Sequence, residues 1–255
     1  MIRGLYTSAS GMMAQYEKMD TISNNLANVD TVGYKKDQVI TASFEEELVK
    51  RINDRQGQVP VSRPKNIGTM SLGVKVDEIF TNFTQGSLQE TNQELDLALH
   101  GVGFFTVLAQ EGGEERYTRN GAFLLDPSRR LVTATGERVM GQQGPITLPV
   151  GDVTIKDTGE IFVNGVFIDR LQIQSFDDSR TLRKIGDNLL AATEQSQPRA
   201  FEGTVRQGFL ESSNVNPVRE MVEMITVMRT YEASQKALQA QDQTLEKLIN
   251  EVSRV

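Results

Sequence analysis

The chain has 255 residues and a formal net charge of −7, and it contains neither cysteine nor tryptophan. The lack of cysteine excludes disulfides and thiol catalysis, and mild acidity without a long basic run gives no indication of nucleic-acid binding. No window of eighteen apolar residues predicts a membrane-spanning helix, and the first twenty residues lack the uninterrupted apolar core of a Sec-type signal peptide.

Residues 5–28 predict an amphipathic helix, about 36 Å long. Its apolar residues recur with alternating steps of four and three, a spacing typical of a heptad stripe. Met13 and Ile22 widen the apolar face, and Ser23 takes the one polar position of the stripe. The apolar stripe consists of Leu5, Ala9, Met12, Tyr16, Met19 and Leu26.

The helix is followed by an amide-rich stretch within "SNNLANVDTVGYKK", residues 23–36. Asparagine side chains can hydrogen-bond the backbone near a helix end, in this chain or in a neighbouring one, and Gly33 permits a left-handed turn. The amphipathic Tyr34 and two lysines complete the stretch. We therefore expect the chain to change direction sharply here. The asparagines concerned are Asn24, Asn25 and Asn28.

The middle of the chain predicts an extended connector over residues 36–71 and an antiparallel β domain over residues 72–210. The connector is polar and punctuated by glycine and proline, at Gly57, Pro60, Pro64 and Gly68. In the β domain, "YTRNGAFLL", "LVTATGERV" and "IFVNGVFIDRLQI" each place a glycine-centred turn between strand-like runs. Asn164-Gly165 is the strongest hairpin signal.

Residues 217–252 predict a second helix, about 54 Å long. Asn216 can cap it, Pro217 suits the first helical position, and Glu220 lies in the first turn, where the helix dipole favours a carboxylate. The same heptad spacing recurs, with polar residues at two positions, Gln235 and Asp242. The apolar positions are Met221, Met224, Met228, Tyr231, Leu238, Leu245, Ile249 and Val252.

Two terminal stripes can bury each other only if the chain returns on itself. We therefore predict an α+β fold in which the terminal segments, residues 1–35 and 211–255, form an antiparallel coiled coil, joined by the connector and the central antiparallel β domain. Apolar groups beside the stripes would stay exposed unless other subunits cover them, which favours assembly. These additional groups are Met13, Ile22, Val222 and Ile225.

No catalytic, cofactor-binding or metal-binding motif stands out. "HGVGFF" lacks the third glycine and the βαβ context of a dinucleotide site. His100 is the single histidine and cannot by itself form the usual kind of zinc site. Glu94 and Asp96 share one face of a predicted strand, which we interpret as a solvated face. We expect no enzymatic activity, no cofactor and no metal.

Four ordered motifs resemble those of flagellar rod and hook proteins, and together they span nearly the whole chain. "TQGSLQETNQELDLALHGVGFFTV" and "YTRNGAF" resemble the start of the family's β domain and its next hairpin. The N-terminal signature is similar through Asn25, Leu26, Ala27, Asn28, Thr31, Gly33, Tyr34 and Lys35. The C-terminal signature is similar through Gln207, Gly208, Glu211, Ser213, Asn214, Val215, Asn216, Met221, Ile225 and Tyr231.

Within this family, chain length is similar to that of the F and G types of rod protein. "RVMGQQGPITLP" and "GEIFVNGVFIDRLQI" favour the F type, with the G type as the alternative. Pro217 and Arg219 stand where the family more often has apolar and acidic residues, which affects the expected local subunit contacts.

The resemblance implies a structural subunit of the basal-body rod, the drive shaft that crosses the periplasm or cell wall. It implies export by the flagellar type III apparatus without a cleaved signal peptide, no membrane insertion, and a helical polymer with itself and other rod and hook proteins. An exported adhesin and a rod-associated wall hydrolase are the alternatives. The expected assembly interface comprises Met12, Met13, Tyr16, Met19, Asn24, Asn25, Asn28, Gly33, Tyr34, Asn214, Asn216, Met221, Met224, Met228, Tyr231, Leu238, Leu245 and Ile249.

Overall fold

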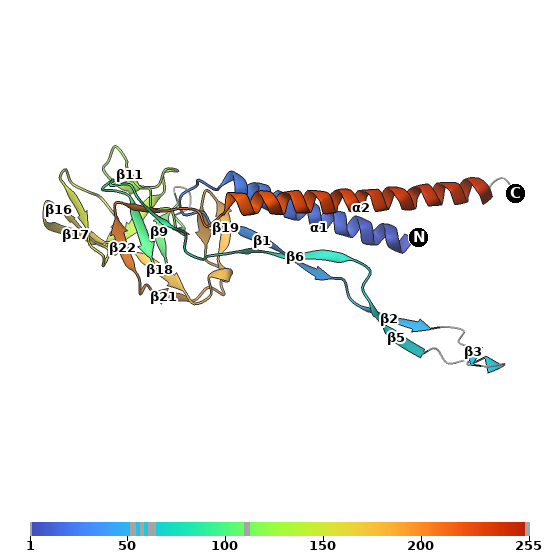
Figure 1. The fold of residues 1–255 in the computed structure, drawn as a ribbon. Helices are drawn as coiled ribbons and strands as arrows, with labels where there is room; N and C mark the ends of the chain where they lie inside the picture. Colours follow the sequence, from blue (N-terminus) through green and yellow to red (C-terminus); the bar gives the residue numbers. More distant parts are fainter. Residues whose placement is uncertain (1, 52–54, 57–58, 61–64, 110–112, 253–255) are drawn as a thin grey trace. The chain divides into compact units, whose positions relative to one another are not determined.

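The computed structural model divides the chain into two compact units (Figure 1). The helical unit comprises Met1–Leu26, Asp37–Phe80 and Pro217–Val255, and the β unit comprises Ala27–Lys36 and Thr81–Asn216. Among the described residues, no helix combines the length and hydropathy needed to cross a membrane. The structure describes residues 2–51, 55–56, 59–60, 65–109 and 113–252.

The helical unit contains the two long helices expected from the heptad patterns, α1 (Ile2–Ala27) and α2 (Pro217–Val252). Helix α2 begins at Pro217 with Glu220 in its first turn, as predicted. Proline suits this position because it lacks an amide hydrogen, and an amide hydrogen here would have no acceptor within the helix.

Burial along α1 does not follow the predicted apolar stripe. The buried positions are small or polar, with Ile22 as the one large aliphatic exception, whereas Tyr16 is 59% exposed and Met13 is 74% exposed. The other large residues of the stripe are only partly buried. On α1 the buried residues are Ala14, Thr21, Ile22 and Asn25.

Helix α2 shows a mixed outcome at the predicted heptad positions. Four positions of the stripe are partly buried, namely Met224, Tyr231, Leu238 and Leu245, and beside the stripe Glu220 and Val227 are fully buried. Five positions are exposed, namely Met221, Met228, Gln235, Asp242 and Ile249. The side chain of Val252 lies outside the described part of the structure.

Contacts between the two helices involve small residues, and the order of the contacts along α1 is the reverse of their order along α2. A Cβ added at Gly4 of α1 would lie 2.6 Å from the Nε2 atom of Gln241 in α2, and one added at Gly11 would lie 3.9 Å from the Oγ atom of Ser234. The Nδ2 atom of Asn25 lies 3.5 Å from a carboxylate oxygen of Glu220. From one contact to the next, the residue number in α1 increases by as much as the residue number in α2 decreases. The two helices therefore run antiparallel in a constant register.

The segment predicted as an extended connector, residues 36–71, forms strands β1 to β5 in the helical unit, and their neighbour β6 lies within the predicted β domain, residues 72–210. Strands β1 and β6 pair, as do β2 and β5 and the short β3 and β4, because backbone amides and carbonyls need partners and a strand pair supplies them. Gly57 and Pro64 lie outside the described residues. The bounds are β1 (Asp37–Ser43), β2 (Glu47–Arg51), β3 (Arg55–Gln56), β4 (Val59–Pro60), β5 (Lys65–Met70) and β6 (Val74–Thr81).

The β unit is built from short antiparallel strands, as predicted. Its strands and one short 3-10 helix are β7 (Leu88–Glu90), β8 (Leu97–His100), β9 (Phe104–Leu108), β10 (Glu115–Thr118), β11 (Leu124–Leu125), β12 (Leu131–Val132), β13 (Arg138–Gly141), β14 (Gly144–Pro145), β15 (Val153–Ile155), β16 (Glu160–Val163), β17 (Val166–Arg170), β18 (Ile173–Phe176), η1 (Ser179–Thr181), β19 (Arg183–Gly186), β20 (Leu189–Ala191), β21 (Pro198–Ala200), β22 (Thr204–Gln207) and β23 (Phe209–Glu211).

Strand β9 lies at the centre of the largest sheet, where it pairs with β10, β13 and β18 over a core that includes Phe105 and Val107. The predicted turn at Asn164-Gly165 is confirmed: Val163 pairs with Val166 across it, and both turn residues have positive φ, as a two-residue type I′ hairpin requires. The last strands return to the first ones, because β22 pairs with β8 and β23 with β7. This return brings the two ends of the β unit together.

Candidate functional site

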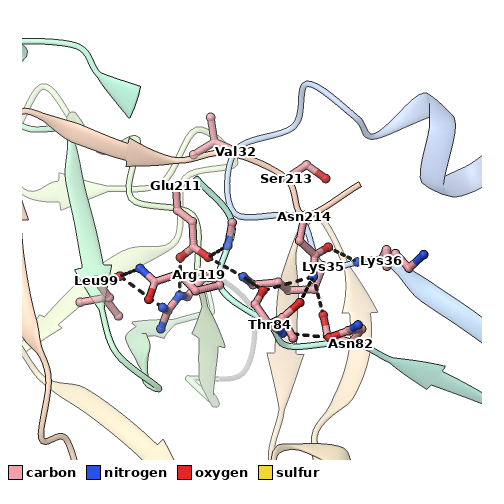
Figure 2. A network of polar contacts seen from close by, with 12 residues as sticks. Val32, Lys35, Lys36, Asn82, Thr84, Leu99, Arg119, Glu211, Ser213 and Asn214 are labelled. Carbon is pink, nitrogen blue, oxygen red and sulfur yellow. Dashed lines mark hydrogen bonds and ion pairs between the residues drawn. The ribbon is translucent and has the colours of Figure 1, made fainter. Parts of the chain in front are cut away.

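Glu211, at the end of β23, is the centre of a buried cluster of charged residues (Figure 2). Its side chain is only 1% exposed, and two cations reach it from distant parts of the sequence. Lys35 comes from the segment that follows α1, and Arg119 follows strand β10. We call Lys35, Arg119 and Glu211 the ion cluster.

Each carboxylate oxygen of Glu211 has a charged donor. The Nζ atom of Lys35 lies 2.5 Å from one oxygen, which also accepts a hydrogen bond of 2.9 Å from the amide of Gly86. The Nε atom of Arg119 lies 2.6 Å from the other oxygen. Lys35 also donates to the carbonyl of Thr84 over 2.8 Å. Burial of these charges is tolerated because each has a partner of opposite charge and further hydrogen bonds.

Arg119 uses its remaining nitrogens on backbone carbonyls. One terminal nitrogen donates to the carbonyls of Leu99 and Gly101, at 3.2 and 2.6 Å, and the other donates to that of Gly103. The guanidinium therefore ties the turn after β8 to Glu211. Arginine suits this position better than lysine, because its planar guanidinium holds several donors in a fixed geometry.

The pKa values of the cluster show how burial and charge compete. Burial lowers the pKa of the Lys35 ammonium, and the Glu211 carboxylate only partly opposes this. For Glu211, burial acts to raise the pKa, but Arg119 and Lys35 outweigh it and hold the pKa below its usual value. Glu211 is therefore a carboxylate, and it stabilises the fold in that form.

The lowered pKa of Glu211 predicts loss of stability in acid. Its contribution is fully present above the unfolded-state pKa of about 4.3 and disappears as the pH falls through the lower folded-state pKa. The free energy of unfolding of the β unit, measured with urea and circular dichroism from about pH 7 to about pH 3, should decrease over that window. The change should be smaller in Glu211→Gln; equal pH profiles would contradict the assignment. Asp126 and Glu137, whose pKa values are also lowered, contribute equally to both proteins.

The segment before Lys35 is held by close backbone contacts. The amide of Gly33 donates to the carbonyl of Glu211 over 2.7 Å. Gly33 has a φ of +69°, and a Cβ added there would lie 2.6 Å from the carbonyl carbon of Arg119. The predicted turn at Gly33 therefore has two requirements, a left-handed conformation and the absence of a side chain.

The β19–β20 hairpin contacts the same segment. Asn188 donates through its side-chain amide to the carbonyl of Val32 over 2.9 Å, and Lys184 donates to that of Lys35 over 2.7 Å. The ammonium of Lys184 also lies 4.6 Å from the centre of the buried Tyr34 ring, in a cation–π contact. The hairpin thus fixes residues 32–35 in place.

Two of the predicted asparagines bind backbone within the chain. Asn25, buried on α1, donates to the carbonyl of Asp37 over 2.8 Å and accepts from its amide over 2.9 Å. In the β unit, Asn214 accepts from the amide of Lys36 and donates to the carbonyl of Asn82, both over 2.8 Å. Each amide pairs with extended backbone as another strand would.

The other predicted interface residues have various environments. Asn28 accepts a hydrogen bond of 3.2 Å from the Thr31 hydroxyl, and Asn24 and Asn216 are exposed. The methionine and tyrosine positions range from partly buried to largely exposed, as described for α1 and α2. Their role in assembly stays a prediction.

The ion cluster was not predicted from the sequence, although each of its residues lies in one of the family-like motifs. Lys35 and Glu211 belong to the N-terminal and C-terminal signatures, and Arg119 is in "YTRNGAF". Thr84 and Gly86, which bind the cluster, are in "TQGSLQE". The available signal was that each motif carries charged or small residues among apolar ones.

The cluster is built to hold the fold together rather than to bind a substrate. The cavity beside it, lined by residues such as Phe83 and Leu190, measures about 20 Å³, which is room for about one water molecule. Among the described residues, no group of histidine, aspartate and glutamate side chains could hold a metal ion. Long terminal helices together with a satisfied internal ion cluster are features typical of an architectural protein.

Comparisons with known proteins agree with this class. Three family models match the chain: "Flagella basal body rod protein" at residues 5–35, "Flagellar hook protein FlgE/F/G D1 domain" at 98–163 and "Flagellar basal body rod FlgEFG protein C-terminal" at 206–251. The chain belongs to the flagellar basal-body rod protein family, and it is FlgF-like or FlgG-like. The family is structural and not enzymatic.

Relatives match over nearly their full length. The flagellar basal-body rod protein FlgG of Borreliella burgdorferi is 36% identical over 96% of this chain and 97% of the relative. The rod protein FlgF of Caulobacter vibrioides is 33% identical, covering 93% of each chain. The flagellar hook-basal body complex protein FlhO of Bacillus subtilis is 31% identical over the whole of both chains.

Proposed function

We propose that this chain is a structural subunit of the bacterial flagellar basal-body rod. The observation that carries this proposal is 36% identity with a rod protein over 96% of the chain. We place the protein in the basal body, where the rod crosses the periplasm or cell wall, and expect its delivery by the flagellar export apparatus. Its partners would be further copies of itself and other rod and hook proteins.

We further propose that α1 and α2 pair as an antiparallel coiled coil. The contacts of Gly4 with Gln241 and of Gly11 with Ser234 support this pairing, because they follow one constant antiparallel register. Small residues let two helix backbones approach closely. Because small residues make this contact, the larger apolar side chains lie on the outer faces of the helices.

These outer faces are the proposed assembly surface. Met13 and Tyr16 of α1 and Met221 and Ile249 of α2 are each about half exposed or more. Exposed apolar groups at such density mark interaction sites, and methionine adapts to several neighbours. A contact between different faces of identical subunits that does not close into a ring generates an open helical polymer. Torque would then pass as shear between closely packed neighbouring helices.

Electron microscopy of basal bodies from cells lacking this protein tests the proposed function. A structural rod subunit should leave a rod that stops at a defined height, and expression of the chain should restore the full length. Rods of normal length and number in the deletion strain would refute the proposal. An adhesin would not produce a fixed stopping point.

Replacing Met13 by lysine should block assembly and leave the free subunit folded. The side chain is 74% exposed, so the substitution removes little packing within the chain but places a charge on the proposed apolar surface. We expect loss of swimming in soft agar, with an unchanged thermal unfolding curve of the purified protein. Gln239→Lys, at an exposed position on the polar side of α2, is the control and should swim normally. Normal swimming by both variants would count against the surface.

A further inference from the structure

We propose that residues 28–36 fold as part of the β unit and not with α1, so that the ion cluster closes in the free subunit whether or not the terminal helices are formed. The proposal concerns the soluble chain and does not depend on rod assembly. It predicts that order extends beyond the β strands into the segment that leads to α1.

Elements of the β unit make several contacts with this segment. Glu211 binds the amide of Gly33 and the ammonium of Lys35. Asn188 binds the carbonyl of Val32, and Lys184 binds that of Lys35. Two separate elements, strand β23 and the β19–β20 hairpin, therefore hold the segment.

Residues become more deeply buried where the chain leaves α1. Gly33, Tyr34 and Lys35 are consecutive buried residues, whereas Met13 and Tyr16 of α1 expose most of their surface. A helix with large exposed apolar groups gains little from packing, and helix propensity alone rarely stabilises such a segment in water. Residues 33–35 are thus buried without interruption, whereas on α1 four of the described side chains are buried.

A closed ion cluster has a consequence for the helices. The amide of Lys36 donates to the side chain of Asn214 over 2.8 Å, so the two connections to the helical unit are tied to each other inside the β unit. Lys36 precedes β1, and Asn214 lies three positions before α2 begins at Pro217. Tying the ends of two flexible segments raises their effective concentration and reduces the entropic cost of pairing them.

Hydrogen exchange on the purified full chain, followed by mass spectrometry, tests the proposal. The helix-breaking variant Ala14→Pro removes a helical hydrogen bond at a buried position, so exchange within residues 2–26 should be at least as fast as in the unaltered chain. Peptides containing the amides of Gly33 and Lys36 should keep the exchange rates of the unaltered chain.

A second variant examines the same peptides from the side of the β unit. Asn188→Ala removes a contact with Val32, and it should raise exchange in residues 31–36 and leave residues 2–26 close to the unaltered rate. The proposal is overturned if Ala14→Pro accelerates exchange at residues 31–36 as much as in α1. It is equally overturned if Ala14→Pro unfolds strand β9, or if residues 31–36 exchange at unprotected rates in the unaltered chain.

Discussion

Replacing Glu211 by glutamine should lower the free energy of unfolding of the β unit by about 3–5 kcal/mol, the usual cost of breaking a buried ion pair by removing one partner. Glutamine has nearly the same shape and can still accept the Gly86 amide, so packing is little changed. The loss arises because Lys35 and Arg119 keep their positive charges in a buried site that no longer contains an anion.

An exposed ion pair in the same unit provides the matched control. Arg199 and Glu202 lie 2.8 Å apart, with side chains that are 57% and 74% exposed. Glu202→Gln should therefore change stability by less than about 1 kcal/mol. Urea unfolding of both variants, with hydrogen exchange at β9 as a local probe, compares the stability lost at the buried ion cluster with that lost at the exposed pair. Equal losses in the two variants would show that the ion cluster contributes no more than a surface pair.

A second consequence of Glu211→Gln separates anchoring from overall stability. Gly33 bonds to the backbone carbonyl of residue 211, which the substitution keeps, whereas Lys35 bonds to the side chain. Exchange should therefore rise more at residues 35–36 than at the core strand β9 under conditions where the variant stays folded. Simple core damage would raise exchange throughout the unit.

The sequence was sufficient to predict both helices, the start of α2 and the Asn164-Gly165 hairpin, because each depends on local preferences. It did not predict the buried face of α1. Apolar periodicity identifies the helix face that gains most from transfer out of water. The face of α1 that contacts α2 instead contains Gly4 and Gly11, which have no side chain and so allow a close approach. Where backbones approach closely, small residues determine the contact. The large residues are left for other surfaces.

The ion cluster was beyond sequence reasoning for a different reason. Lysine, arginine and glutamate are mostly exposed in proteins, so no local pattern marks them as buried. Lys35 and Glu211 are separated by 176 positions and meet only because β23 returns to β7. The asparagines gave a better signal, since amide-rich sequence near a helix end predicted backbone binding. Among these asparagines, that binding occurs within the chain at Asn25.

Replacing Gly33 by alanine should remove residues 31–36 from the β unit and abolish motility. An L-residue at a φ of +69° costs about 1–2 kcal/mol. The added Cβ would also lie 2.6 Å from the backbone of Arg119, and relieving such overpacking typically costs about 1–3 kcal/mol more. The segment can relieve both costs by moving away, and that movement breaks the Gly33–Glu211 hydrogen bond and withdraws Lys35 from the ion cluster.

Gly165→Ala distinguishes strain from steric contact. Gly165 has a φ of +80° and no atom within 4 Å of an added Cβ, so this variant carries the conformational cost alone. It should lose about 1–2 kcal/mol of stability, swim normally and keep slow exchange at residues 31–36. Gly33→Ala should exceed that loss and show fast exchange in this segment. If the two variants lose equal stability and both swim, close packing against Arg119 is not what requires glycine at position 33.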